Sequence, residues 1–174
     1  MEAQNVILAR RSIRDFLQKP IEAEKIQRIL RAGMEAPSAH NRRPWEFIVF
    51  TDDEQRNAVA EMSPWAKMLT KAAAGIAVCA NLELGESKEG SEDTYWVQDC
   101  SAATENILLQ AAQEKLGGVW LGWYPDSNRV KRFSDYFKLP KHIVPLSVIA
   151  LGYPAKDAEP ANRYDEKLVH FGKW

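Results

Sequence analysis

The hydrophobic positions of this chain change repeatedly between the spacing of helices and that of strands. Apolar residues recur at helical spacing, and so predict helices, within 1–11, 21–33, 53–62, 67–74, 92–115 and 127–136. Short runs rich in aromatic, β-branched or continuously apolar residues predict strands at 45–50, 75–81, 119–123 and 146–151. Because helices and strands do not alternate as regular βαβ units, this order favours an α+β fold with a mixed central sheet flanked by helices.

Short polar residues and glycines mark several predicted helix ends. Asp52 and Asp126 precede helices and can accept hydrogen bonds from their first N–H groups, and Ser91 can do the same for the longest helix. Gly117, followed by Gly118, is interpreted as the stop of that longest helix. No repeat, low-complexity tract or linker divides the chain, so we expect one domain spanning residues 1–174.

The longest predicted helix and the C-terminal tail carry apolar residues that a lone small domain would leave uncovered. The helix at 92–115 is apolar on more than one face, which predicts burial on several sides and favours a subunit interface. The tail at 154–174 is polar but ends in Val169, Phe171 and Trp174. We therefore expect this tail to be an arm that docks on another surface, most simply on a partner subunit.

Charge and composition exclude several classes of function. The 174 residues include 23 Lys and Arg and 24 Asp and Glu, with no basic stripe to attract nucleic acid or an anionic membrane. No continuous apolar stretch is long enough to span a bilayer. The first nine residues do not resemble a secretory signal, and Cys79 and Cys100 are interpreted as buried free thiols, so we expect a cytoplasmic protein. His, Cys, Asp and Glu show no metal-binding spacing, so no metal site is expected.

A basic run near the N-terminus is the clearest candidate for a ligand site. Residues Arg10, Arg11, Ser12 and Arg14 place three guanidinium groups and a hydroxyl within five positions. On an extended segment Arg10, Ser12 and Arg14 point the same way, and planar guanidinium forks suit a phosphate. The alternative is a solvated basic stretch at the end of a short helix. The sequence holds neither a G-x-G-x-x-G nor a G-x-x-x-x-G-K-[ST] loop, so side chains must do much of any phosphate binding.

Four motifs in order resemble the nitroreductase family of FMN-dependent flavoproteins. They are RRSIRDF near the N-terminus, APSAHNRRPWEFIVF after the second helix, the long helix running into LGGVWLGWYP, and ALGYP followed by a late Arg163. The resemblance covers nearly the whole chain. It implies an intertwined homodimer with FMN in the subunit interface and C-terminal segments wrapping the partner. It also implies hydride transfer from NAD(P)H to flavin N5 and then reduction of a nitroaromatic, quinone or similar acceptor by a ping-pong mechanism.

The resemblance also implies which residues contact the cofactor. By position they are Arg10, Arg11, Ser12, Arg14, Pro37, Ser38, Ala39, Asn41, Leu121, Gly122 and Arg163. The basic run and Arg163 match contacts to the phosphate and ribityl chain, with the pyrimidine edge of the flavin as the alternative for Arg14. The loop at 37–41 matches one laid on the flavin by a neighbouring subunit, and the strand end at 121–122 faces the isoalloxazine. Lys67 is a weaker candidate for a cation near the flavin carbonyl. No catalytic acid, base or nucleophile is expected, because the cofactor carries the chemistry.

The chain departs from the family pattern at Arg43, where a neutral amide is expected. If Arg43 points at the flavin or the substrate, its charge would raise the reduction potential or favour anionic substrates, whereas a solvent-facing Arg43 would change neither. Two other functions stay open. One is a non-catalytic module that binds or stores FMN or uses it as a redox sensor. The short chain motivates this alternative, because little sequence is left for a lid over a substrate. The other is specialised flavin chemistry such as reductive dehalogenation, for which no lid insertion is visible.

Overall fold

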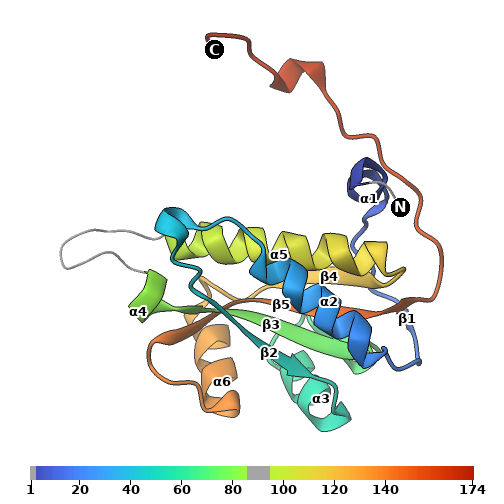
Figure 1. Cartoon of the computed structure of the whole chain (residues 1–174). Helices are drawn as coiled ribbons and strands as arrows, with labels where there is room; N and C mark the ends of the chain where they lie inside the picture. The colour runs from blue at the N-terminus through green and yellow to red at the C-terminus, as the bar shows by residue number, and fades with distance from the viewer. Residues whose placement is uncertain (1–2, 86–94) are drawn as a thin grey trace.

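A five-stranded sheet forms the centre of the computed structural model, which describes residues 3–85 and 95–174 (Figure 1). The longest strand, β5 (Ile143–Pro154), pairs with β3 (Ala74–Asn81), with β4 (Gly117–Gly122) and, near its end, with the short β1 (Phe16–Leu17). The outer strand β2 (Trp45–Phe50) pairs with β3. Every residue of β3 except the last is buried, which explains why its sequence is continuously apolar.

Helices cover both faces of this sheet. The long helix α5 (Tyr95–Gln113) and α2 (Ala23–Met34) pack on one face, and α3 (Asp53–Glu61) and α6 (Ser127–Phe137) lie on the other (Figure 1). Successive side chains of a strand point to opposite faces, so the sheet separates two hydrophobic clusters. One contains Ile76 with the helical residues of α2 and α5, and the other contains Ala77 with those of α3 and α6.

The remaining helical segments are short. They are α1 (Ala3–Ala9), α4 (Leu82–Gly85) and the three 3-10 turns η1 (Ala39–Asn41), η2 (Lys67–Thr70) and η3 (Glu166–Leu168). In the part of the chain that the structure describes, no helix is long and apolar enough to cross a membrane.

Most of the predicted elements are confirmed. The strand at 45–50 has the predicted bounds. The carboxylate of Asp52 accepts from the N–H groups of Glu54 and Gln55, and that of Asp126 accepts from the N–H of Arg129, so both predicted caps form. The predicted cap at Ser91 and the first predicted residues of the long helix lie outside the described residues.

The structure corrects the interpretation of the glycines at 117 and 118. The long helix ends at Gln113, Lys115 adopts the left-handed conformation with φ 60°, and both glycines belong to strand β4. A Cβ at Gly117 would lie 2.7 Å from the Cβ of Ile13, so the glycine is needed where the N-terminal segment crosses the strand. The glycine pair therefore serves a close backbone approach rather than a helix stop.

Two further predictions differ in detail from the structure. The sheet ladders are all antiparallel, and the parallel component among the described residues is the isolated bridge between Ser12 and Gly118. The helix predicted at 67–74 is only the single turn η2, because the chain enters β3 at Ala74.

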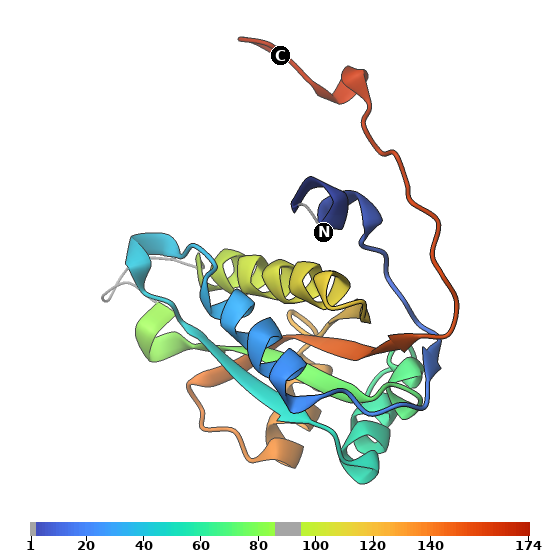
Figure 2. The ribbon, with the colours of Figure 1, turned by 45° about the vertical axis from the view of Figure 1, so that its right-hand side comes forward.

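The C-terminal arm leaves the body of the fold after β5. In Figures 1 and 2 the chain beyond Pro154 runs away from the sheet and ends far from it. The Phe171 side chain is 92% exposed and that of Trp174 is fully exposed, so the part of the chain that the structure describes leaves the aromatic end of the arm open to solvent. Exposed aromatic side chains of this size are typical of surfaces that bind another surface.

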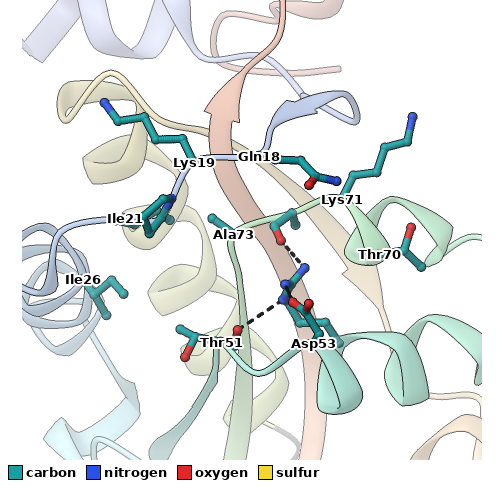
Figure 3. A pocket seen from close by; sticks show the side chains of 12 residues that line it. Gln18, Lys19, Ile21, Ile26, Thr51, Asp53, Thr70, Lys71 and Ala73 are labelled. Atoms are coloured by element: carbon teal, nitrogen blue, oxygen red, sulfur yellow. Dashed lines mark hydrogen bonds and ion pairs between the residues drawn. The ribbon is translucent and has the colours of Figure 1, made fainter.

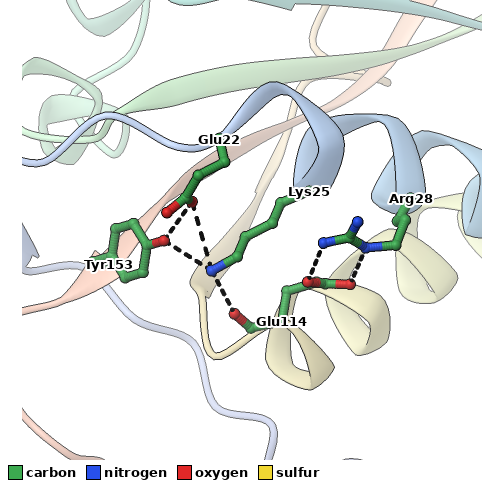
Figure 4. Close-up of polar contacts among 5 residues, drawn as sticks. All are labelled: Glu22, Lys25, Arg28, Glu114 and Tyr153. Carbon is green, nitrogen blue, oxygen red and sulfur yellow. Dashed lines mark hydrogen bonds and ion pairs between the residues drawn. The ribbon is translucent and has the colours of Figure 1, made fainter.

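A polar cluster fixes the point from which the arm departs (Figure 4). The Tyr153 hydroxyl donates to Glu22 Oε2 at 2.5 Å and accepts from Lys25 Nζ at 2.8 Å. Lys25 also donates to the Glu114 carbonyl at 3.3 Å, while the Glu114 carboxylate binds the Arg28 guanidinium at 2.7 and 2.9 Å. The cluster ties the first turns of α2 to the segment after α5 and to the end of β5.

This cluster gives the protein an acid-sensitive contribution to stability. The hydrogen bond from Tyr153 lowers the pKa of Glu22 from 4.5 to about 2. Because the ionised carboxylate is the favoured form in the fold, its contribution is complete above pH 4.5 and is lost as the pH falls toward 2. The free energy of unfolding of Tyr153→Phe should therefore fall below the wild-type value by more at pH 6 than at pH 3. Urea denaturation at the two pH values measures this, and an equal difference at both would contradict it.

The two cysteines are buried and unpaired, as predicted. Cys79 belongs to one hydrophobic cluster and Cys100 to the other, on opposite faces of the sheet. Burial raises the pKa of Cys79 to about 12 and also raises that of Cys100. Since the thiolate is the reactive form, we expect no reaction of the native protein with a disulfide reagent at pH 8, and reaction of both thiols in denaturant. Rapid labelling of the native chain would contradict this.

Candidate functional site

A cavity of about 530 Å³ opens beside the end of strand β4. It is built by β4, by the segment that leads into η2, by the start of α6 and by the N-terminal basic run. Its lining residues are Arg14, Pro64, Trp65, Met68, Val119, Trp120, Leu121, Gly122, Tyr124 and Arg129. Aromatic and apolar walls with a few polar groups are typical of sites for planar organic ligands.

The backbone at the end of β4 faces open space. Leu121 is buried, whereas Gly122 is exposed, and a Cβ at Gly122 would meet no atom within 4 Å. This glycine is therefore not required by packing within the chain. Its lack of a side chain instead allows a ligand to approach the strand end closely.

Arg129 holds this strand end in place. Its Nη1 donates to the Gly122 carbonyl at 2.6 Å, while its Nε lies 3.0 Å from Asp126 Oδ2. Asp126 in turn accepts from the Arg129 N–H, and this bond, together with the guanidinium, lowers the pKa of the Asp126 carboxyl. The first turn of α6 thus holds the Gly122 carbonyl, at the open end of β4, in place.

The structure divides the predicted basic run between two hollows that both border β4. Arg14 lines the 530 Å³ cavity, and its Nη1 lies 3.4 Å from the Ser12 carbonyl. Arg10 and Arg11 line a second hollow of about 280 Å³, together with Lys115, Lys156 and Gly118. Ser12, exposed, lies between the two arginine positions and forms its bridge to Gly118.

The second hollow, which we call the basic hollow, is lined by a guanidinium group whose hydrogen-bond donors are not all paired. Arg10 Nε pairs with Glu105 Oε1 at 3.1 Å, and Arg11 Nε donates to the Glu159 carbonyl of the arm at 2.9 Å. Arg11 Nη2 is buried and has no hydrogen-bond partner among the described residues. A buried cationic N–H without an acceptor is costly, and an anion in the basic hollow would supply one.

The loop before β2 contains the other predicted cofactor residues. His40, Asn41 and Arg43 all adopt the left-handed conformation, with φ between 50° and 55°. Such residues cost of order 1 kcal/mol each and persist only where the surroundings hold them. Here buried Asp99 accepts from the Ala39 N–H at 2.9 Å, and Ser38 Oγ accepts from the Arg43 N–H at 2.9 Å. The loop is therefore rigidly presented, with the Arg43 side chain exposed.

This loop and Arg163 do not border the 530 Å³ cavity. The structure brings Arg14, Leu121 and Gly122 together around it. Pro37, Ser38, Ala39 and Asn41 lie instead near the start of α5, where Asp99 holds them, and Arg163 is exposed on the arm. Lys67 is exposed on η2, one residue before Met68, which lines the cavity. One chain alone thus brings together only part of the predicted set.

Buried Arg56 holds the segment at η2 that carries Met68 of the cavity wall, a role that the sequence did not indicate. Its guanidinium donates to the carbonyls of Leu69 at 3.2 Å and Thr51 at 3.4 Å, and also contacts the Ala72 carbonyl and the Asp53 carboxylate. These bonds hold the end of η2 and the residues that follow it, and Arg56 lines a separate hollow of about 450 Å³ (Figure 3). In sequence, a single arginine in a polar helix indicates only an exposed face.

Comparisons with known proteins agree on one family. The sequence profile of the Nitroreductase family matches residues 7–83 and 63–153. A protein of Archaeoglobus fulgidus with the provisional name NADH dehydrogenase/NAD(P)H nitroreductase is 42% identical over 176 residues, covering 99% of each chain. A solved structure from Bacteroides thetaiotaomicron with the same provisional name is 43% identical with a TM-score of 0.91, covering 99% of this chain and 98% of that one. The FMN-dependent nitroreductase of Clostridium difficile is 28% identical with a TM-score of 0.87, over 97% and 98% of the two chains.

Proposed function

Because this chain belongs to the nitroreductase family, we propose that it works as a homodimeric, FMN-dependent NAD(P)H oxidoreductase that reduces a quinone, nitroaromatic or similar acceptor. The observation that carries the proposal is the pair of hollows along β4. One is an aromatic cavity with an open glycine backbone, and the other is basic and contains a guanidinium N–H without an acceptor. A flavin ring and a phosphate need these two environments.

The residues present fit FMN. Leu121 and the open backbone of Gly122 would face the ring, with Trp120 as an apolar wall. Arg10 and Arg11 in the basic hollow would bind the phosphate, with Ser12 between the hollows as a hydroxyl for the ribityl chain. Charge-assisted hydrogen bonds from guanidinium groups are the strong kind that phosphate binding requires. Arg14, in the cavity itself, would lie toward the ring.

A second subunit would complete the site. The rigid loop at 37–41 and Arg163 lie away from the cavity of their own chain, as they must if each serves the site of a partner. The exposed aromatic end of the arm and an apolar groove of about 380 Å³ between α1, α2 and α5 both need cover. The partner would supply that cover, and the many-sided apolar character of α5 supports this arrangement.

FMN supplies the redox chemistry when bound, since it stores two electrons between the donor and the acceptor. The chain's own groups stabilise the extra negative charge that the reduced ring acquires. Arg14 contributes a fixed positive charge, and Arg129 holds the Gly122 carbonyl so that the strand end keeps its position beside the ligand. Buried Val119 and Leu121 exclude water from the inner wall.

NAD(P)H and the acceptor would use the same open cavity in turn. The cavity borders the open backbone of Gly122, so both substrates would approach the ring there and alternate. Alternation predicts ping-pong kinetics, in which each substrate reacts only after the other product has left. No acid or base side chain of the chain is needed for the transfer.

Steady-state turnover tests this function against simple flavin binding. FMN-loaded protein is mixed with NADH or NADPH and a quinone, and initial rates are measured over a grid of both concentrations. The proposal expects parallel lines in double-reciprocal plots. Protein that retains FMN but oxidises neither nucleotide would instead indicate a storage or sensing module.

A further inference from the structure

Trp65 is an exposed indole on the wall of the cavity. Its side chain is 76% exposed, although tryptophan is among the residues that gain most from burial. Among the described residues, no aromatic ring packs against it. It lines the cavity together with Pro64, Met68 and Tyr124. Packing within the chain therefore does not explain this tryptophan.

The backbone that carries Trp65 is rigidly held. Met62, Ser63 and Ala66 are buried on either side of it. The Trp65 N–H donates to Ser63 Oγ at 3.3 Å, and the Ala66 N–H donates to the Ser63 carbonyl at 3.0 Å. From the other side, Arg132 of α6 donates to the Met62 carbonyl at 3.2 Å. An exposed indole on a fixed backbone loses little further freedom when a ring stacks on it.

The opposite part of this wall is also ordered. Tyr124 makes an edge-to-face contact with buried Trp96 of α5, with ring centroids 4.8 Å apart. Met68 is partly buried against the core and presents a polarizable thioether, which packs well on aromatic rings. Neither Pro64, Trp65, Met68 nor Tyr124 carries a charge, and Arg129 is already paired with Asp126. This part of the wall is thus aromatic and apolar and carries no charge of its own, whereas Arg14 lines another part of the cavity.

We propose that Trp65 is the residue that selects the electron acceptor, by stacking on a neutral, planar, two-ring aromatic such as a naphthoquinone. The inference rests on the proposed function and adds to it the class of acceptor. The indole is itself a fused two-ring plane, so a two-ring acceptor covers it more completely than a single ring does. Inorganic acceptors, which have no π face, gain nothing from Trp65.

The first test measures binding without turnover. Protein loaded with FMN is titrated by calorimetry with 2-naphthol, a neutral two-ring aromatic that the enzyme cannot reduce. Trp65→Ala should weaken binding about tenfold, and Trp65→Phe should weaken it by less, because a smaller ring keeps part of the stacking. Tyr136→Ala serves as the matched control, since Tyr136 is an exposed aromatic on α6 that does not line the cavity. Equal affinity of wild type and Trp65→Ala would overturn the inference.

The second test uses the two kinds of acceptor. In ping-pong kinetics kcat/KM for the acceptor reports only the acceptor's own half of the cycle. Trp65→Ala should lower kcat/KM for 1,4-naphthoquinone about tenfold through KM, and leave that for ferricyanide unchanged. A parallel loss with both acceptors, or a change in oligomeric state by sedimentation, would assign Trp65 to folding or to the subunit contact and overturn the inference. Failure of the proposed function itself would give a different result: the wild-type protein would not retain FMN, or would not oxidise NADH or NADPH with any acceptor.

Discussion

Replacing Arg10 and Arg14 together with alanine is expected to weaken FMN binding at least about a hundredfold, because each charge-assisted contact contributes roughly 1.5–3 kcal/mol. The two arginines border different hollows on the same strand, so the double variant removes a cation from both ends of the ligand. It also leaves Glu105 without the partner that now lies 3.1 Å away, which places a negative charge beside the phosphate.

Titration calorimetry of the apoprotein with FMN measures this loss. The control is the double variant Arg31→Ala and Lys141→Ala, which changes the net charge equally at exposed positions away from both hollows. The control should bind FMN like the wild type. An affinity of the Arg10 and Arg14 variant within threefold of the wild type would exclude these residues from the cofactor site.

Replacing Arg56 with methionine is expected to lower the free energy of unfolding by about 2–5 kcal/mol, because two buried carbonyls lose their donor. The guanidinium is buried and satisfies the carbonyls of Leu69 and Ala72, both of which belong to buried residues. Methionine fills a similar length but donates no hydrogen bond, so these carbonyls lose their partner within the core. Since η2 carries Met68, the cavity wall should loosen as well.

Arg132→Met is the matched control for this prediction. Arg132 also donates to two backbone carbonyls, those of Glu61 and Met62, but its side chain is exposed and water can replace it. Urea denaturation should show a loss of less than about 1 kcal/mol for Arg132→Met. Similar losses in the two variants would mean that burial does not determine how much these hydrogen bonds contribute to the free energy of unfolding.

The hydrophobic pattern predicted most of the helices and strands, because burial against the core determines which positions in them are apolar. The strand at 45–50 and the buried strand β3 follow directly from their residue types, and the caps at Asp52 and Asp126 follow from the geometry of helix ends. The glycines at 117 and 118 were misassigned because their causes are contacts between residues that are not neighbours in sequence: Ile13 of the N-terminal segment leaves no room for a side chain at Gly117, and Leu108 of α5 leaves little at Gly118.

The candidate site was predictable mainly through its resemblance to a family. Residue types alone indicated an anion site at the basic run, but not that Arg10 and Arg14 would border separate hollows on one strand. Trp65, Arg56 and Arg129 carry no sequence signal for their roles. Each depends on a contact that only the folded chain creates: an uncovered cavity wall, a set of buried carbonyls and the end of β4.

The proposed function requires that this chain hold FMN in a state that a nicotinamide nucleotide can reduce. Anaerobic titration of the FMN-loaded protein with NADH and with NADPH tests it most directly, with the visible absorbance of the flavin as the readout. With at least one of the two nucleotides, bleaching should be complete at one equivalent of nucleotide per bound FMN. Protein that does not retain FMN after reconstitution, or bound FMN that stays oxidised with both nucleotides, would contradict it.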